Sequence, residues 1–111
     1  AREGNYLESS ATALFIYTLA KAVNKGYISK DYIEPTRKAF DGMVKTFTRL
    51  EEDGSYTITN CCAVAGLGGD SKRYRDGSFE YYISEPVIEN DPKSVGSFIL
   101  AAIEYEKMTD K

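Results

Sequence analysis

The residues of this chain that are best suited to chemistry gather in one segment, YRDGSFEYYISEPVIENDPKSVG at positions 74–96. This segment contains five carboxylates: Asp76, Glu80, Glu85, Glu89 and Asp91. Two carboxyl groups held at a fixed separation are the usual acid and base of glycoside cleavage. Because spacing along a loop does not fix that separation, the residues alone favour carboxylates that are solvated or that cap helices.

The same segment also contains four aromatic residues: Tyr74, Phe79, Tyr81 and Tyr82. Aromatic faces stack on the C–H faces of sugar rings, and tyrosine hydroxyls form hydrogen bonds with sugar hydroxyls. Packing in a core is the commoner role of any single aromatic residue. A sugar site and a packing role therefore both remain open.

Three glycines, Gly66, Gly68 and Gly69, cluster in the sequence AGLGGD. Clustered glycines let backbone N–H groups approach a phosphate closely. However, no Gly-Lys-Ser/Thr follows, and no strand-then-helix pattern surrounds the cluster. We therefore interpret it as an irregular tight turn.

Composition excludes several classes of function. The chain contains no histidine, which rules out Ser-His-Asp and Cys-His catalysis within it and any histidine-containing metal site. The formal net charge is −3, and no run of lysine or arginine is present, so we expect neither nucleic acid nor a membrane surface as a partner. No apolar stretch is long enough to span a bilayer.

The two cysteines, Cys61 and Cys62, are neighbours in the sequence. Adjacent Cα atoms lie about 3.8 Å apart, which is unfavourable for a disulfide between them. We expect two buried, reduced thiols with a packing role. Reduced thiols favour a reducing compartment, and hence the cytoplasm rather than the periplasm.

Two segments are expected to form helices that are buried on most sides, because apolar residues cover nearly their whole circumference: Leu7–Lys25 and Lys93–Lys107. Asn5 is the candidate N-cap of the first, with Glu8 completing a capping box, and Gly26 ends it. Asp91 and Pro92 are the expected cap and first residue of the other.

A helix with one apolar face, and hence on the surface, is expected at Asp31–Leu50, with Pro35 in its first turn. After the Asp53-Gly54 turn, the alternation in Ser55–Asn60 predicts a short strand, and Phe79–Ile83 is a candidate partner strand. The resulting order of inner, outer and inner helices is typical of a two-layer helical toroid.

The segments GNYLESSATALFIYTLAKAV, CCAVAGLGG, YRDGSFEYYISEP and ENDPKSVGSFILAAIE resemble the C-terminal part of the unsaturated rhamnogalacturonyl hydrolases, glycoside hydrolase family 105, which is related to family 88. The resemblance covers essentially the whole chain. It implies a mainly α fold, namely the C-terminal part of an (α/α)6 barrel with about three helices, a long loop and room for a short β-hairpin. Residues 1–111 would then be the C-terminal segment of a single barrel domain, taken from a longer chain.

The resemblance also implies a function in bacterial pectin degradation and carbohydrate metabolism. Enzymes of this family remove the 4,5-unsaturated galacturonyl residue from the non-reducing end of rhamnogalacturonan fragments. An aspartic acid protonates the C4=C5 double bond, water adds at C5, and the resulting hemiketal collapses to release the sugar. The implied partner of the full-length protein is an unsaturated pectic oligosaccharide, and no metal or organic cofactor is implied.

In the family, the catalytic aspartic acid and most sugar-contacting residues come from earlier helices. We therefore assign no catalytic residue and no metal ligand here, and we expect this segment alone to be inactive. Nine matching positions are expected to bind substrate at the pocket rim, where inner helices and their preceding loops begin: Asn5, Glu8, Ser9, Tyr74, Arg75, Asp76, Asn90, Asp91 and Lys93.

Two other functions remain open, a non-catalytic carbohydrate-binding module and a helical interaction module, since a fold does not fix a function.

The three expected long helices are too few to cover the two inner helices on all sides. We therefore expect exposed apolar flanks on those helices, which would make the isolated segment self-associate or pack loosely.

Overall fold

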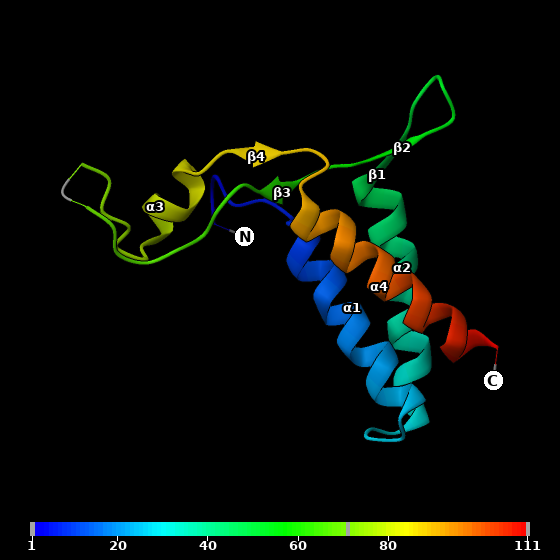
Figure 1. Cartoon of the computed structure of the whole chain (residues 1–111). Helices are drawn as coiled ribbons and strands as arrows, with labels where there is room; N and C mark the ends of the chain where they lie inside the picture. The colour runs from blue at the N-terminus through cyan, green and yellow to red at the C-terminus, as the bar shows by residue number, and fades with distance from the viewer. Residues whose placement is uncertain (1, 71, 111) are drawn as a thin grey trace.

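A computed structural model describes residues 2–70 and 72–110 and shows a mainly helical protein (Figure 1). Its three long helices pack together: α1 (Ser9–Asn24), α2 (Ile33–Phe47) and α4 (Pro92–Thr109). Helices α1 and α4 begin at the same end of the bundle and run in the same direction, whereas α2 runs the opposite way. No helix in the described part of the chain has the length and apolar character needed to cross a membrane.

The core lies where the three long helices meet. Its buried members are Ala13, Ile16, Met43, Phe47 and Ala101. Phe40 of α2 stacks on Tyr105 of α4 with ring centroids 4.0 Å apart, which joins the outer helix to the second inner one. The three expected long helices are therefore present in the expected order.

The start of α1 differs from the expected capping box. Glu8, not Asn5, is the N-cap: its carboxylate accepts the N–H groups of Ser10 and Ala11, and the helix begins at Ser9. The side chain of Asn5 instead accepts the N–H of Tyr6 at 2.9 Å. A carboxylate that reaches two free N–H groups at a helix N-terminus satisfies both and also gains from the helix dipole.

The other helix ends are close to those expected. Gly26 has the left-handed φ of 72° expected just after α1. Asp91 caps α4, and Pro92 is its first residue, as predicted. Before α2, a short 3-10 helix, η1 (Lys30–Tyr32), takes the place of its predicted first turn.

The predicted end of α2 is wrong, because residues 48–50 leave the helix and form a strand. This strand, β1 (Thr48–Leu50), pairs antiparallel with β2 (Tyr56–Ile58), so the predicted strand in 55–60 is confirmed but with another partner. Gly54, at φ 86°, makes the turn between them. The pairing satisfies backbone groups on both segments, which decides against helix continuation.

The predicted strand Phe79–Ile83 is also wrong, because this segment forms the short helix α3 (Phe79–Ser84). The hydroxyl of Ser78 accepts the N–H of Tyr81 at 3.0 Å and caps the helix. The strands of this part of the chain come before and after α3 instead: β3 (Cys61–Cys62) pairs antiparallel with β4 (Val87–Ile88). Residues 63–70 and 72–86 thus form an arm that is closed at its base by β3 and β4 and that projects from the bundle (Figure 1).

Both cysteines are buried free thiols, as predicted. Burial raises the pKa of each thiol, so both stay protonated at neutral pH. A protonated, buried thiol is a poor nucleophile. The pair therefore has a packing role in β3.

The inner helices retain exposed apolar side chains on the sides that face away from the core. Phe15 on α1 is 71% exposed and Ile99 on α4 is 54% exposed. Leu14, Leu100 and Ile103 are also exposed on these two helices. These five side chains are the apolar flanks of α1 and α4. Flanks of this kind favour association with another surface.

We propose that the isolated chain self-associates through these flanks or binds hydrophobic dyes. Phe15→Lys and Ile99→Lys should each lower the average mass in light scattering and reduce dye fluorescence, because a charge in the contact must be desolvated. Glu52→Gln changes the net charge by the same amount at an exposed position and should leave both signals unchanged. A wild-type chain that is a compact monomer and ignores the dye would contradict this expectation.

Candidate functional site

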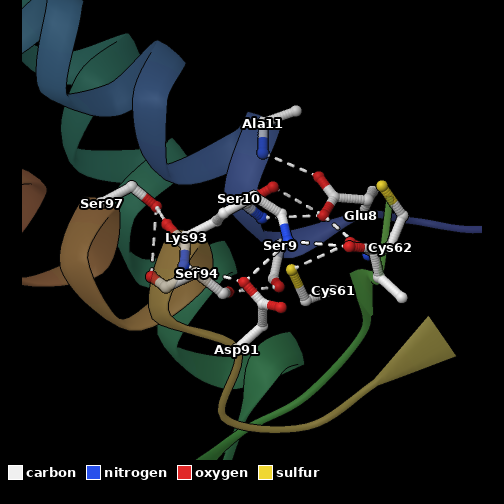
Figure 2. A network of polar contacts seen from close by, with 11 residues as sticks. Glu8, Ser9, Ser10, Ala11, Cys61, Cys62, Asp91, Lys93, Ser94 and Ser97 are labelled. Atoms are coloured by element: carbon white, nitrogen blue, oxygen red, sulfur yellow. Dashed lines mark hydrogen bonds and ion pairs between the residues drawn. The ribbon is translucent and has the colours of Figure 1, made fainter. Parts of the chain in front are cut away.

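Helices α1 and α4 begin in direct contact, joined by a hydrogen bond between two serines. The hydroxyls of Ser9 and Ser94 lie 2.6 Å apart, and both residues are fully buried (Figure 2). The N–H of Ser9 also donates to the carbonyl of Asn60 at 2.9 Å, just before β3. The two helix starts and β3 therefore form one rigid rim, and the cluster shown in Figure 2 is the candidate site.

Glu8 joins the start of α1 to β3. Its carboxylate accepts the N–H of Ala11 at 2.7 Å, the hydroxyl of Ser10 at 2.8 Å and the N–H of Cys62 at 3.1 Å. Burial by itself raises the pKa of Glu8, but these donors outweigh it, and the pKa lies below its ordinary value. Glu8 is thus an anion with its oxygens occupied, which suits an anchor and does not suit a proton donor at neutral pH.

Asp91 and Lys93 form the other half of the rim, at the start of α4. One carboxylate oxygen of Asp91 accepts both the backbone N–H and the Nζ of Lys93, each at 2.8 Å. The Nζ also donates to the carbonyl of Ala63 at 3.0 Å. The bond to Lys93 lowers the pKa of Asp91, and the same bond raises that of Lys93. The Lys93 side chain is half-exposed, so it presents a cation at the rim.

The arm has its own polar centre around Glu85, which is only 3% exposed. Its carboxylate accepts a hydrogen bond from Arg73 at 2.7 Å, and the Nε of Arg75 lies 3.6 Å from its other oxygen. Burial by itself raises the pKa of Glu85. The Tyr81 hydroxyl and the two guanidinium groups lower it by more than burial raises it, so the pKa lies below its ordinary value. This ion pair joins the end of α3 to the turn around residue 74.

Three candidate residues, Asn90, Asp76 and Asn5, form hydrogen bonds with residues outside the rim cluster. Asn90, in the left-handed region at φ 54°, accepts the N–H of Ile58 at 2.9 Å and donates its own N–H to the same residue at 2.8 Å. Asp76 accepts the N–H of Ser78 at 2.8 Å, just before α3. Asn5 is exposed before the start of α1.

Seven of the nine predicted site residues divide into two groups, and the other two, Asn5 and Asn90, belong to neither. Glu8, Ser9, Asp91 and Lys93 come together at the rim (Figure 2). Tyr74, Arg75 and Asp76 lie on the arm, where Tyr74 is exposed and Arg75 faces Glu85. That any of them binds substrate stays a prediction.

Sequence reasoning missed Ser94 and the backbone N–H of Cys62. Its expectation that the carboxylates are solvated or cap helices is wrong for Glu85, which is buried and paired with Arg73. The signal for Ser94 was present, because a small polar residue on an otherwise apolar buried helix favours a polar contact with a neighbouring helix. Nothing in the spacing along the chain indicated that Glu85 would meet Arg73. The role of the Cys62 N–H depends on where β3 lies relative to α1, and local sequence does not encode that.

Comparison with known proteins gives consistent results. A family model described as Glycosyl Hydrolase Family 88 matches residues 1–109. A solved structure described as a C. acetobutylicum ATCC 824 glycoside hydrolase from family 105 superposes with a TM-score of 0.91 at 45% identity, over 95% of this chain and 29% of that one.

Two curated proteins are also similar. Protein Atu3128 of Agrobacterium fabrum and the 24.9 kDa protein in picA locus of Rhizobium radiobacter are each 39% identical over 105 residues, covering 91% of this chain and 45% of theirs. The chain thus spans less than half the length of these curated relatives and less than a third of the solved structure.

The bond between Ser9 and Ser94 can be tested by a double-mutant cycle. Ser9→Ala or Ser94→Ala leaves the other hydroxyl buried without its partner, which should cost about 1–3 kcal/mol of unfolding free energy. The double variant should lose clearly less than the sum of the two, because no buried hydroxyl remains unpaired. Denaturant unfolding measures all four proteins, and Thr18→Ala, at an exposed hydroxyl on α1, is the control. Strictly additive losses would show that the two hydroxyls do not interact.

The ion pair of Glu85 should make stability depend on pH. Because its pKa is lowered on folding, Glu85 stabilises the fold above its ordinary pKa of 4.5 and loses this contribution as pH falls through its folded value. Wild type should therefore unfold at a higher temperature than Glu85→Gln at neutral pH, and the difference should shrink in acid. The control Glu80→Gln removes an exposed carboxylate of α3 and should show little difference at either pH. A constant gap between wild type and Glu85→Gln across the range would exclude this role.

Proposed function

The chain belongs to glycosyl hydrolase family 88, and from that premise we propose that it forms one wall of a glycosidase that removes a 4,5-unsaturated galacturonyl residue from rhamnogalacturonan fragments. The observation that carries the proposal is the parallel pairing of α1 and α4, whose starts meet at the bond of 2.6 Å between Ser9 and Ser94. Two inner helices that start together place their polar first turns on one rim of a barrel. A rim with a few convergent polar groups is the usual setting for a ligand.

The proposed reaction begins with proton transfer from an aspartic acid to C4 of the unsaturated sugar. Water then adds at C5, and the hemiketal that results collapses to release the next sugar. The donor must carry its proton at the working pH. Glu8 and Asp91 both have lowered pKa values, so neither suits this role. We propose that the acid lies in another part of a longer polypeptide, and that this chain contributes positioning.

Lys93 is suited to bind the carboxylate of an unsaturated uronate through its charged ammonium group. Its Nζ is held at the rim by Asp91 and by the carbonyl of Ala63, while its side chain stays 51% exposed. A lysine with a raised pKa is fully charged at neutral pH. Arg75 is the second cation among the candidate residues, but its side chain is only 28% exposed and lies beside Glu85 on the arm, away from the rim. We therefore assign the carboxylate contact to Lys93.

Activity assays test both parts of the proposal. The isolated chain should not reduce the ultraviolet absorbance of the conjugated uronate, whereas the whole enzyme should. In the whole enzyme, Lys93→Met should raise KM about tenfold with a smaller effect on kcat, because it removes a charge-assisted bond made to the bound substrate.

The control for Lys93→Met is Lys45→Met, which removes the same charge from the exposed face of α2. It should leave both kinetic constants unchanged. Turnover by the isolated chain would disprove the assignment of the acid to another part of the protein. A Lys93→Met enzyme with an unchanged KM would disprove the carboxylate contact.

A further inference from the structure

A small pocket lies on the arm, apart from the rim cluster. Its volume is about 230 Å³, and residues from two stretches of the arm line it: Ala65, Gly66 and Leu67 from one, and Gly77, Ser78, Tyr81 and Tyr82 from the other. Leu67, Tyr81 and Tyr82 have the largest side chains among them. None of the described lining residues carries a charge.

The aromatic wall of this pocket is held in place from behind. The ring of Tyr82 stacks on that of Tyr6, with centroids 5.5 Å apart and planes 4° apart. The hydroxyl of Tyr81 accepts the N–H of Gly66 at 3.2 Å, which ties α3 to the opposite wall. Because both rings are fixed before any ligand arrives, little side-chain entropy is lost on binding.

The opposite wall has a shape that depends on glycine. Gly77 has a left-handed φ of 76°, and a Cβ added there would lie 2.7 Å from the Cδ2 of Leu67. A Cβ at Gly66 would meet the side chain of Arg75 at 3.4 Å. A side chain at Gly77 would be strained by the positive φ and would displace Leu67, whereas a Cβ at Gly66 would make only an ordinary contact with Arg75, so of these two glycines only Gly77 constrains the wall.

The base of the arm stabilises the pocket as well. Pairing between β3 and β4 closes the arm, and the buried Glu85 binds Arg73 at 2.7 Å within it. Leu67 nevertheless remains 80% exposed, although it is a large apolar side chain on the pocket edge. An exposed leucine beside two ordered aromatic rings offers apolar surface to a ligand.

The chemistry of the lining favours a neutral sugar ring. Aromatic faces match the C–H face of a sugar ring, and the pocket presents the rings of Tyr81 and Tyr82. A uronate carboxylate would enter a pocket without a lining cation and lose hydration there. The anionic sugar is therefore expected at the rim, near Lys93, and an uncharged one in the arm pocket.

We propose that the arm pocket binds a neutral sugar ring of the oligosaccharide, with the ring stacked on Tyr82 and in contact with Leu67. The assignment to a substrate sugar rests on the function proposed above, whereas the affinity for a neutral ring rests on the pocket alone. The arm joins the bundle at the end where α1 and α4 begin (Figure 1). In this proposal the unsaturated end of the oligosaccharide lies at the rim and a neutral ring lies on the arm.

Direct binding tests this without any turnover. Methyl rhamnoside is the neutral probe and galacturonate the anionic one, and saturation-transfer NMR reports the protein contact of each. Methyl rhamnoside should bind and galacturonate should not compete with it. Tyr82→Ala should weaken binding about two- to tenfold through loss of the stacked face.

A second variant separates binding from folding. Leu67→Trp places a larger ring at an exposed position, so it should leave the circular dichroism and the unfolding temperature unchanged while it blocks the pocket and abolishes the signal. The control Leu50→Trp makes the same change on the exposed hairpin strand β1 and should bind like wild type.

The outcomes distinguish this proposal from the proposed function. Equal binding by wild type and Leu67→Trp, no binding by wild type, or equal binding of galacturonate in the pocket would overturn the arm pocket. Binding that follows the expected pattern supports the pocket even if the whole enzyme fails to act on unsaturated uronates, in which case only the proposed reaction falls.

Discussion

The close approach of α1 and α4 is the constraint on which the rest of this structure depends. Small side chains occupy much of their contact, including Ser9 and Ala13 on one helix and Ser94 and Ala101 on the other. The distance between packed helices depends on the side chains between them, so small residues allow a short one. The bond between Ser9 and Ser94 then satisfies two hydroxyls that this approach buries.

A second polar contact holds the same two helices together at their other ends. The side-chain nitrogen of Asn24 donates to the backbone carbonyl of Glu104 at 2.9 Å and to its carboxylate at 3.0 Å. Polar contacts at both ends, with apolar packing between, fix the relative rotation and translation of the helices. This explains how two helices that are apolar on most sides can have a defined register, since apolar packing alone is weakly directional.

The rim and the arm follow from this pair. Once α1 is placed, Glu8 fixes β3 through the N–H of Cys62, and β3 fixes β4 through strand pairing. The arm between these two strands is then positioned by backbone bonds at its base and by the stack of Tyr6 on Tyr82. Lys93 on the rim and Tyr82 on the arm, which follow Ser9 by 84 and 73 residues in the sequence, thus depend on one helix pair.

The sequence by itself determined the features that a few neighbouring residues encode. These include the three long helices, the cap at Asp91, the turn at Gly26 and the strand at 56–58, because periodicity and capping are local. Only the tertiary structure decided that Glu8 caps α1, that residues 48–50 form a strand and that 79–83 form a helix. It also decided which candidate residues meet, bringing Glu8 near Lys93 and leaving Tyr74 on the arm. Glu8 also accepts the N–H of the distant Cys62, and β3 pairs with β4 rather than with residues 79–83. Satisfying buried polar groups in this way outweighs the weak local preference of each segment.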